Sequence, residues 1–200
     1  MTTWWWVRHG PTHEKAFVGW RDVPADLSDT ARIERLDRYL PSDALLVSSD
    51  LIRSVATADA LSAGRTRLEH APDIREFDFG DWDGLGFEAV AARDPVLSRE
   101  YWEKPGEVAA PNGESWNQAA ARVDRFVTAM NVEYAGRNII AVAHFGVILT
   151  RIQQARGIPA HQSLAHEVGN LSVTRLNWDG AWDVGEIGYH PVDGVGNNNG

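Results

Sequence analysis

The feature that most constrains this chain is an apolar run, Trp4 to Val7, that ends directly in the triplet Arg8-His9-Gly10. A short continuous apolar run with polar boundaries is typical of a buried strand, so we expect the triplet where a strand gives way to a loop. Neutral imidazole can attack phosphorus, a guanidinium can hold phosphoryl oxygens in a fork, and glycine lets the backbone approach a ligand closely. The triplet therefore indicates phosphate chemistry at a strand end.

Two further apolar runs, 44–47 and 138–143, are also predicted to be buried strands, and each precedes a segment of helical period. The first of these helices begins after residues 48–49, and the second spans residues 147–155. A third helix is predicted from residue 115 to residue 130. In the first helix Arg53 lies off the apolar stripe, so we expect its side chain to be free to face a ligand. This alternation predicts an α/β sandwich. Segments 171–178 and 181–189 alternate apolar and polar residues around a turn, which predicts a hairpin.

The length and composition favour one domain, because 200 residues with 44% hydrophobic content can bury one core. We expect this domain to span residues 1–193 and residues 194–200 to be a flexible polar tail. Segments 10–27 and 77–113 are rich in glycine, proline and aspartate, and loops of that length are usually functional lids. The tryptophans are expected either to line the site entrance or to pack in the core.

The net charge of −9 argues against a nucleic-acid partner, which would require a basic surface. The N-terminus has no basic residue before a short apolar run, and no other run is long enough to cross a bilayer, so we predict neither a signal peptide nor a membrane partner. These features favour a cytoplasmic location. The oligomeric state stays open, a homo-oligomer included. The histidines outside the motifs show no metal-ligand spacing, so we predict no metal and no cofactor.

Four downstream segments match the chemistry of the first triplet. They are Ser49 to Ala58, Arg75 to Gly84, Pro111 to Ser115 and Ala143 to Gly146. Together with Arg8-His9-Gly10, in this order, they resemble the histidine phosphatase superfamily, and the resemblance runs from residue 4 to about residue 177. The resemblance implies a phosphoglycerate mutase-like fold, a three-layer α/β/α sandwich with a mostly parallel central sheet.

The resemblance implies that His9 is the nucleophile and accepts the phosphoryl group. Arg8, Arg53 and a second histidine, His144, would hold the phosphoryl oxygens. The alternatives are a buried histidine bonded to backbone and arginines in surface salt bridges. His144 precedes a helix, whose free N–H groups attract anions.

Glu76 matches the position of the family's proton donor. Three other carboxylates, Asp78, Asp81 and Asp83, lie in the same motif, and crowding of acids would raise the pKa of one of them. Sequence physics alone does not choose among the four. Glu76 is preferred because it follows Arg75 in the matched motif.

Further substrate contacts are expected from Gly10, Thr12, Phe145 and Glu114. Phe145 stands where relatives often have glycine, so its ring would narrow the pocket or redirect the backbone. Glu114, with Ser115, either contacts substrate or begins the following helix as first-turn acid and cap.

We favour a cofactor-independent phosphomonoesterase acting on a small phosphorylated metabolite. Lys15 stands where the mutases carry asparagine, which weakens the alternative of a phosphoglycerate mutase. An α-ribazole phosphatase stays open. A non-catalytic module that binds phosphorylated ligands is the third alternative, although such a module needs neither a nucleophile nor a proton donor.

Overall fold

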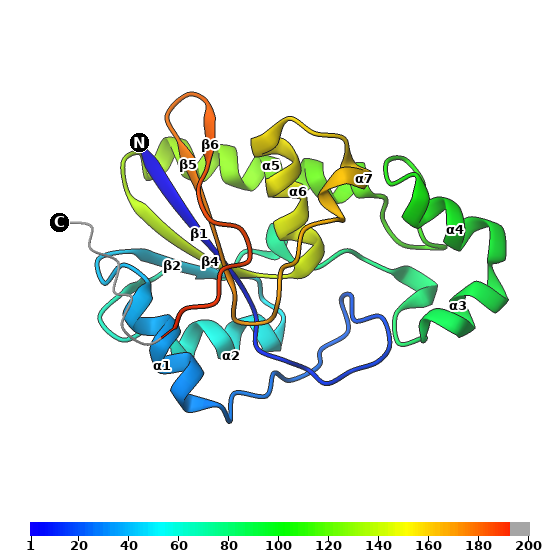
Figure 1. The fold of residues 1–200 in the computed structure, drawn as a ribbon, viewed down its shortest axis with the longest axis horizontal. Helices are drawn as coiled ribbons and strands as arrows, with labels where there is room; N and C mark the ends of the chain where they lie inside the picture. The colour runs from blue at the N-terminus through cyan, green and yellow to red at the C-terminus, as the bar shows by residue number, and fades with distance from the viewer. Residues whose placement is uncertain (193–200) are drawn as a thin grey trace.

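The computed structural model describes residues 1–192, and these are built around a six-stranded sheet with the order β3-β2-β4-β1-β5-β6 (Figure 1). The four strands from β3 to β1 are parallel, whereas β5 runs antiparallel to β1 and β6 antiparallel to β5. The predicted mostly parallel sheet and C-terminal hairpin are thereby confirmed. The strands are β1 (Thr2–Arg8), β2 (Leu45–Ser48), β3 (Thr66–Arg67), β4 (Asn138–Ala143), β5 (Val173–Trp178) and β6 (Trp182–Val184).

Strand β1 lies in the interior because both faces of the sheet are covered. Successive side chains of a strand point to opposite faces. Trp4 and Trp6 belong to the core cluster on one face, and Trp5 and Val7 belong to the cluster on the other. All four are buried, which explains why the strand reads as a continuous apolar run rather than an alternating one.

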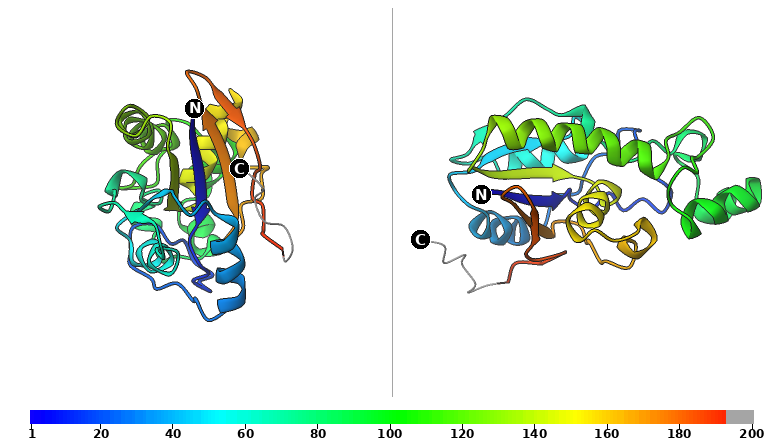
Figure 2. Two further views of the ribbon diagram at one scale, coloured as in Figure 1. Left: turned by 90° about the vertical axis from the view of Figure 1, so that its left-hand side faces the viewer. Right: turned by 90° about the horizontal axis from the view of Figure 1, so that it is seen from above.

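The helices form the two outer layers (Figures 1 and 2). Helices α1 and α2 contribute Leu36 and Ala58 to the cluster around Trp5, and helices α5 and α6 contribute Val123 and Ile148 to the cluster around Trp4. This is the expected three-layer sandwich. The bounds are α1 (Thr30–Tyr39), α2 (Ile52–Ala60), α5 (Trp116–Glu133), α6 (Phe145–Arg156) and α7 (Ala160–Ser163), the last packed on α6.

Helix α5 begins with a capping box. The Ser115 hydroxyl accepts the backbone N–H of Gln118, and the Gln118 side chain accepts the backbone N–H of Ser115. Two otherwise unpaired donors of the helix start are satisfied in this way. Of the two interpretations of Ser115, the structure therefore has the helix cap.

The two segments expected to be excursions from the sheet meet each other. Segment 77–113 holds α3 (Phe87–Arg93), α4 (Pro95–Glu103) and the short helix η2 (Gly80–Trp82), and it extends away from the sheet in Figure 1, as does the irregular segment 10–27. The two are joined where the Phe17 N–H donates to the Leu85 carbonyl over 2.9 Å. Another short helix, η1 (Pro72–Ile74), precedes Glu76. The tail predicted at 194–200 lies outside the described residues. None of the described helices is both long and apolar enough to span a bilayer.

Candidate active site

His9 follows β1 directly and is fixed by two hydrogen bonds. Its backbone N–H donates to the Ala143 carbonyl over 3.1 Å, and its Nδ1 lies 2.7 Å from the Gly10 carbonyl oxygen. Because a carbonyl only accepts, Nδ1 carries the proton and Nε2 keeps its lone pair. The side chain is only 6% exposed. Burial above all, and then the charges of Arg53 and Arg8, lower the pKa of His9 to about 3, so the ring is neutral.

Gly10 allows a close approach of backbone to its surroundings. Its N–H donates to the Thr57 hydroxyl over 3.0 Å, and a Cβ at this position would lie 2.6 Å from the side chain of Leu27. The carbonyl of His9 accepts the Asn170 side-chain amide over 2.8 Å. The nucleophile candidate is thus held by its backbone on both sides, and neither Thr57 nor Asn170 was singled out in the sequence.

His144 lies beside His9, with 5.0 Å between the ring centroids. It follows β4 directly, is the N-cap of α6 and is fully buried. Its Nε2 is 2.7 Å from the Ser49 hydroxyl and 3.2 Å from the Ser54 hydroxyl. Its buried Nδ1 has no hydrogen-bond partner within the described part of the chain. Burial, followed by the neighbouring His9 and Arg53, holds the pKa of His144 well below its usual value.

Neither serine was predicted as a site residue, although both lie in the matched segment 49–58. The sequence signal that could have found them is two hydroxyl residues around the start of α2, together with a histidine directly after the apolar run of β4. A buried neutral imidazole needs such partners for its ring nitrogens.

Arg8 extends from the end of β1 and is partly buried. Its Nη1 donates to the Val168 carbonyl over 2.8 Å, and its guanidinium lies 5.2 Å from the centroid of the Phe145 ring. Its buried Nε has no partner in residues 1–192. Burial lowers its pKa, and the charge of Glu76 acts in the opposite direction.

Arg53 is placed differently from the expectation that it is free to face a ligand. It is fully buried, and its guanidinium donates to the carbonyls of Gly19 over 2.7 Å and Arg21 over 3.1 Å. The irregular segment leaves these carbonyls without backbone partners, and a guanidinium satisfies several at once. Arg53 thus ties α2 to segment 10–27, with its Nε unpartnered among the described residues.

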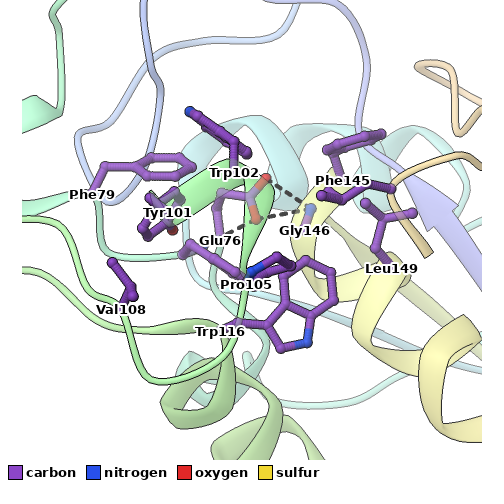
Figure 3. Close-up of a pocket in the computed structure, with 12 residues that line it drawn as sticks. Glu76, Phe79, Tyr101, Trp102, Pro105, Val108, Trp116, Phe145, Gly146 and Leu149 are labelled. Atoms are coloured by element: carbon purple, nitrogen blue, oxygen red, sulfur yellow. Dashed lines mark hydrogen bonds between the residues drawn. The ribbon is translucent and has the colours of Figure 1, made fainter. Parts of the chain in front are cut away.

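Glu76 is buried, with 7% of its surface exposed. Its Oε1 accepts the Phe77 N–H over 3.0 Å, and its two carboxylate oxygens lie 3.1 and 3.3 Å from the Gly146 N–H (Figure 3). Burial raises the pKa of Glu76, against the opposing effects of these N–H groups and of Arg53 and Arg8. The candidate acid is therefore the carboxyl whose environment favours the protonated form.

The three competing carboxylates of the motif have partners elsewhere, so crowding of acids is not what raises this pKa. Asp78 accepts the Gly80 N–H, Asp81 pairs with Arg93, and Asp83 pairs with Arg21. Burial among apolar side chains separates Glu76 from these three.

A cavity of about 40 Å³ lies behind Glu76. Figure 3 shows aromatic and aliphatic side chains around it, including Tyr101, Trp102, Trp116 and Leu149. This apolar surround keeps one side of the Glu76 carboxyl away from water, which is the physical origin of its raised pKa.

Glu114 contacts Arg122 and does not line the cavity described below. It pairs with Arg122, with Nε to Oε1 at 2.9 Å, and Arg122 also donates to the Glu76 carbonyl over 2.9 Å. The same carbonyl accepts the indole N–H of Trp20 over 2.7 Å. Glu114 was predicted to contact substrate or to begin α5. In the structure it instead holds Arg122, which fixes the backbone of Glu76.

A larger cavity of about 390 Å³ opens in front of His9. Among the predicted site residues it brings together Arg8, His9, Thr12, Glu76 and Phe145; Gly10, Arg53, His144 and Glu114 are not in its lining. Sequence reasoning predicted the two segments, 10–27 and 77–113, that supply the remaining wall residues, but not which residues these are. They are Glu14, Ala16, Phe17, Val18, Phe79, Phe87 and Trp102. Of the tryptophans expected at the entrance or in the core, Trp102 borders the cavity and Trp82 is fully buried.

The mostly parallel sheet, with two neutral histidines that follow β1 and β4 and a buried carboxyl at Glu76, defines a phosphoglycerate mutase-like α/β protein. The chain belongs to the histidine phosphatase superfamily (branch 1), whose family model matches residues 4–184.

Individual relatives agree with this assignment. The chain is 34% identical to the bifunctional protein Rv2228c of Mycobacterium tuberculosis, over 84% of this chain and 44% of that protein. It therefore spans less than half the length of this relative. It is 29% identical to the adenosylcobalamin/alpha-ribazole phosphatase of Salmonella typhimurium, over 78% of this chain and 80% of that one. Bacillus stearothermophilus YhfR superposes with a TM-score of 0.86 at 25% identity, covering 94% of this chain and 97% of YhfR.

Proposed function

We propose that this protein is a phosphomonoesterase that hydrolyses a small phosphorylated metabolite through a phosphohistidine on His9, with Glu76 as general acid and base. The observation that carries the proposal is the tautomer of His9. Its Nδ1 is bonded to the Gly10 carbonyl, so the lone pair of the cavity-lining ring is on Nε2.

In the first step, Nε2 of His9 attacks phosphorus and the P–O bond to the leaving group breaks. The proton of the Glu76 carboxyl goes to the departing alkoxide, so that the leaving group departs as an alcohol. A raised pKa at Glu76 supports this assignment, because the acid must be protonated at the start. The low pKa of His9 supports its assignment as the nucleophile, because only a neutral imidazole can attack phosphorus.

In the second step, a water molecule attacks the phosphohistidine and the N–P bond breaks. The Glu76 carboxylate takes the proton of that water, which returns the acid to its initial state and releases inorganic phosphate. Arg8 and His144 would bind the phosphoryl oxygens, since both present an unpartnered nitrogen within the described residues. Arg53 would contribute its charge and its Nε from the buried side of the site.

The alternatives differ in the fate of the phosphoryl group and in the leaving group. A mutase must keep the phosphoenzyme from water, whereas a phosphatase must admit water to it. The similarity to an adenosylcobalamin/alpha-ribazole phosphatase favours hydrolysis. We further propose that segments 10–27 and 77–113 cover the cavity and select the leaving group, because both contribute to its wall.

The test is release of inorganic phosphate from p-nitrophenyl phosphate by the wild type and His9→Ala, with the exposed His161→Ala as control. We expect release to be lost in His9→Ala alone. We also expect an acid-labile phosphoenzyme when the wild type is denatured during turnover with ³²P-labelled substrate. Undiminished release by His9→Ala would overturn the proposal.

A further inference from the structure

The wall of the catalytic cavity has a composition that selects among phosphate esters. Five aromatic residues line it beyond His9, and they come from segments far apart in the chain. Phe17 is central, with its ring centroid 4.5 Å from Phe87, 5.0 Å from Phe79 and 5.8 Å from Trp102. Rings held by one another in this way form an apolar surface before any ligand arrives.

Part of this aromatic surface faces solvent. Phe87 is 63% exposed, although it borders a cavity and contacts Phe17. A large exposed apolar side chain in a cavity wall is a typical mark of a surface that binds an apolar group. Phe87 is the first residue of α3. Helix α3 belongs to the segment that extends away from the sheet (Figure 1).

The charges around the cavity are unfavourable for an anionic leaving group. Arg8 is the one cation among the described lining residues, and the phosphoryl group requires it. The lining also holds Glu14, whose Oε2 is 2.8 Å from Arg21. The Arg21 guanidinium also pairs with Asp83, with 3.2 Å between Nε and Oδ1. This cluster of two carboxylates and one guanidinium therefore has a net charge of one negative unit. Lys15, beside Glu14 in the sequence, is exposed and outside the lining.

We propose, on the basis of the function proposed above, that this cavity binds an uncharged leaving group with an apolar, preferably aromatic, face, and that Glu14 excludes leaving groups that carry a carboxylate. A carboxylate on the substrate would meet Glu14 with no second cation among the described lining residues. An aromatic face would be buried against Phe87 and Trp102.

The test compares three alkyl phosphates, so that the leaving group is an alkoxide in each case: 2-phenylethyl phosphate, glycerol 3-phosphate and 3-phosphoglycerate. We expect kcat/KM to fall in that order. Glu14→Gln should raise kcat/KM for 3-phosphoglycerate relative to glycerol 3-phosphate about fivefold, the size expected for removing one like charge at a partly exposed site. The exposed Glu34→Gln in α1 makes the same charge change away from the cavity and should leave this ratio unaltered.

The apolar half of the proposal has its own variants. Trp102→Ala should lower kcat/KM for 2-phenylethyl phosphate about tenfold relative to glycerol 3-phosphate, which is in the range measured for loss of an aromatic contact. Because Trp102 also packs on Phe17, the exposed Phe87→Ala provides a second variant that should fold normally and lower the same ratio.

The outcomes separate this inference from the function on which it rests. The inference would be overturned if kcat/KM for 3-phosphoglycerate equals or exceeds that for glycerol 3-phosphate. It would also be overturned if Glu14→Gln changes this ratio no more than Glu34→Gln does. Neither result would contradict the proposed phosphatase activity. Absence of phosphate release from all three esters and from p-nitrophenyl phosphate would overturn both.

Discussion

The two carboxylate oxygens of Glu76 share one backbone donor, the N–H of Gly146, at 3.1 and 3.3 Å. Gly146 is the second residue of α6, so the carboxyl faces a helix N-terminus, which favours negative charge. Burial acts in the opposite direction and raises the pKa of Glu76. A group held between these influences suits a residue that must give and then take a proton in one catalytic cycle.

Gly146→Ala should displace this carboxyl. A Cβ at residue 146 would lie 2.7 Å from Glu76 Oε1 and 3.0 Å from the ring of Phe77, both of which are buried. We expect kcat for alkyl phosphates to fall by at least about tenfold, as a small misplacement of a catalytic group costs that much or more. Circular dichroism should show a folded protein. Gly106→Ala, where the nearest atom would be 3.9 Å away, serves as the control; equal kcat in both variants would contradict the role of this contact.

Glu76→Gln should remove the proton donor while keeping the shape of the side chain. We expect kcat to fall roughly 10²- to 10⁴-fold for alkyl phosphates, as for loss of a general acid. The fall should be smaller for p-nitrophenyl phosphate, because a nitrophenolate leaves without a proton.

The pH profile of the wild type follows from the same group. Because the pKa of Glu76 is raised, the acid stays protonated above the usual carboxyl range, and activity should decline on the alkaline side as it ionises. The low pKa of His9 keeps the nucleophile neutral from about pH 3 upward. The optimum should therefore be mildly acidic to neutral. Full alkyl-phosphatase activity well above pH 9 would contradict this pairing of groups.

Ser49→Ala should loosen His144 and weaken its binding of phosphoryl oxygens. The Ser49 hydroxyl is the nearer of the two partners of Nε2, at 2.7 Å against 3.2 Å for Ser54. We expect inhibition by orthovanadate to weaken about tenfold, the size of one unsatisfied buried group, and less in Ser54→Ala. In a His144→Ala background, Ser49→Ala should have no further effect on vanadate binding. An equal loss in that background would mean that Ser49 acts independently of His144.

Stability should fall in acid partly because His9 is buried in its neutral form. Its folded pKa of about 3 lies below the value of 6.5 for an unfolded histidine, so the unfolded chain binds more protons between these limits. The stabilisation is complete above pH 6.5 and is lost as the pH falls, by about 2 kcal/mol at pH 5. Glu76, with its raised pKa, acts in the opposite direction, and its effect is common to the wild type and to histidine variants.

The measurement is the free energy of unfolding in urea at pH 7.5 and at pH 5. His9→Gln should lose about 2 kcal/mol less than the wild type between these pH values. The exposed His161→Gln provides the control and should lose as much as the wild type. Identical losses in the wild type and His9→Gln would show that His9 becomes protonated in the folded state.

Much of the fold could be predicted from local patterns. The apolar run at 138–143 coincides with β4, and the run at 4–7 lies within β1, because a strand buried on both faces has a signature in consecutive residues. The helix predicted from residue 115 is α5, which begins at Trp116 after the Ser115 cap. These elements could be predicted because the spacing of apolar residues and the helix cap are properties of residues close together in the sequence.

The side chains whose environment depends on distant segments were harder to predict. Arg53 was expected to be free to face a ligand, yet its guanidinium donates to backbone carbonyls of segment 18–21. No sequence pattern near residue 53 indicates where those carbonyls lie. Glu114 was expected at the substrate or at a helix start, yet its partner is Arg122, which also donates to the Glu76 carbonyl.

By itself, the sequence determined the order of the central strands and their flanking helices along the chain, which are β1, β2, α2, α5, β4, α6, β5 and β6. It also determined the triplet at the end of β1 and the chemistry of its imidazole and guanidinium groups. Tertiary structure decided which nitrogen of His9 is free, why the pKa of Glu76 is raised, and that Phe17, Phe87 and Trp102 form one wall beside Glu14. The physical reason is that the electrostatic environment of a side chain, and the surface it shares with others, depend on atoms brought close by folding rather than by chain connectivity.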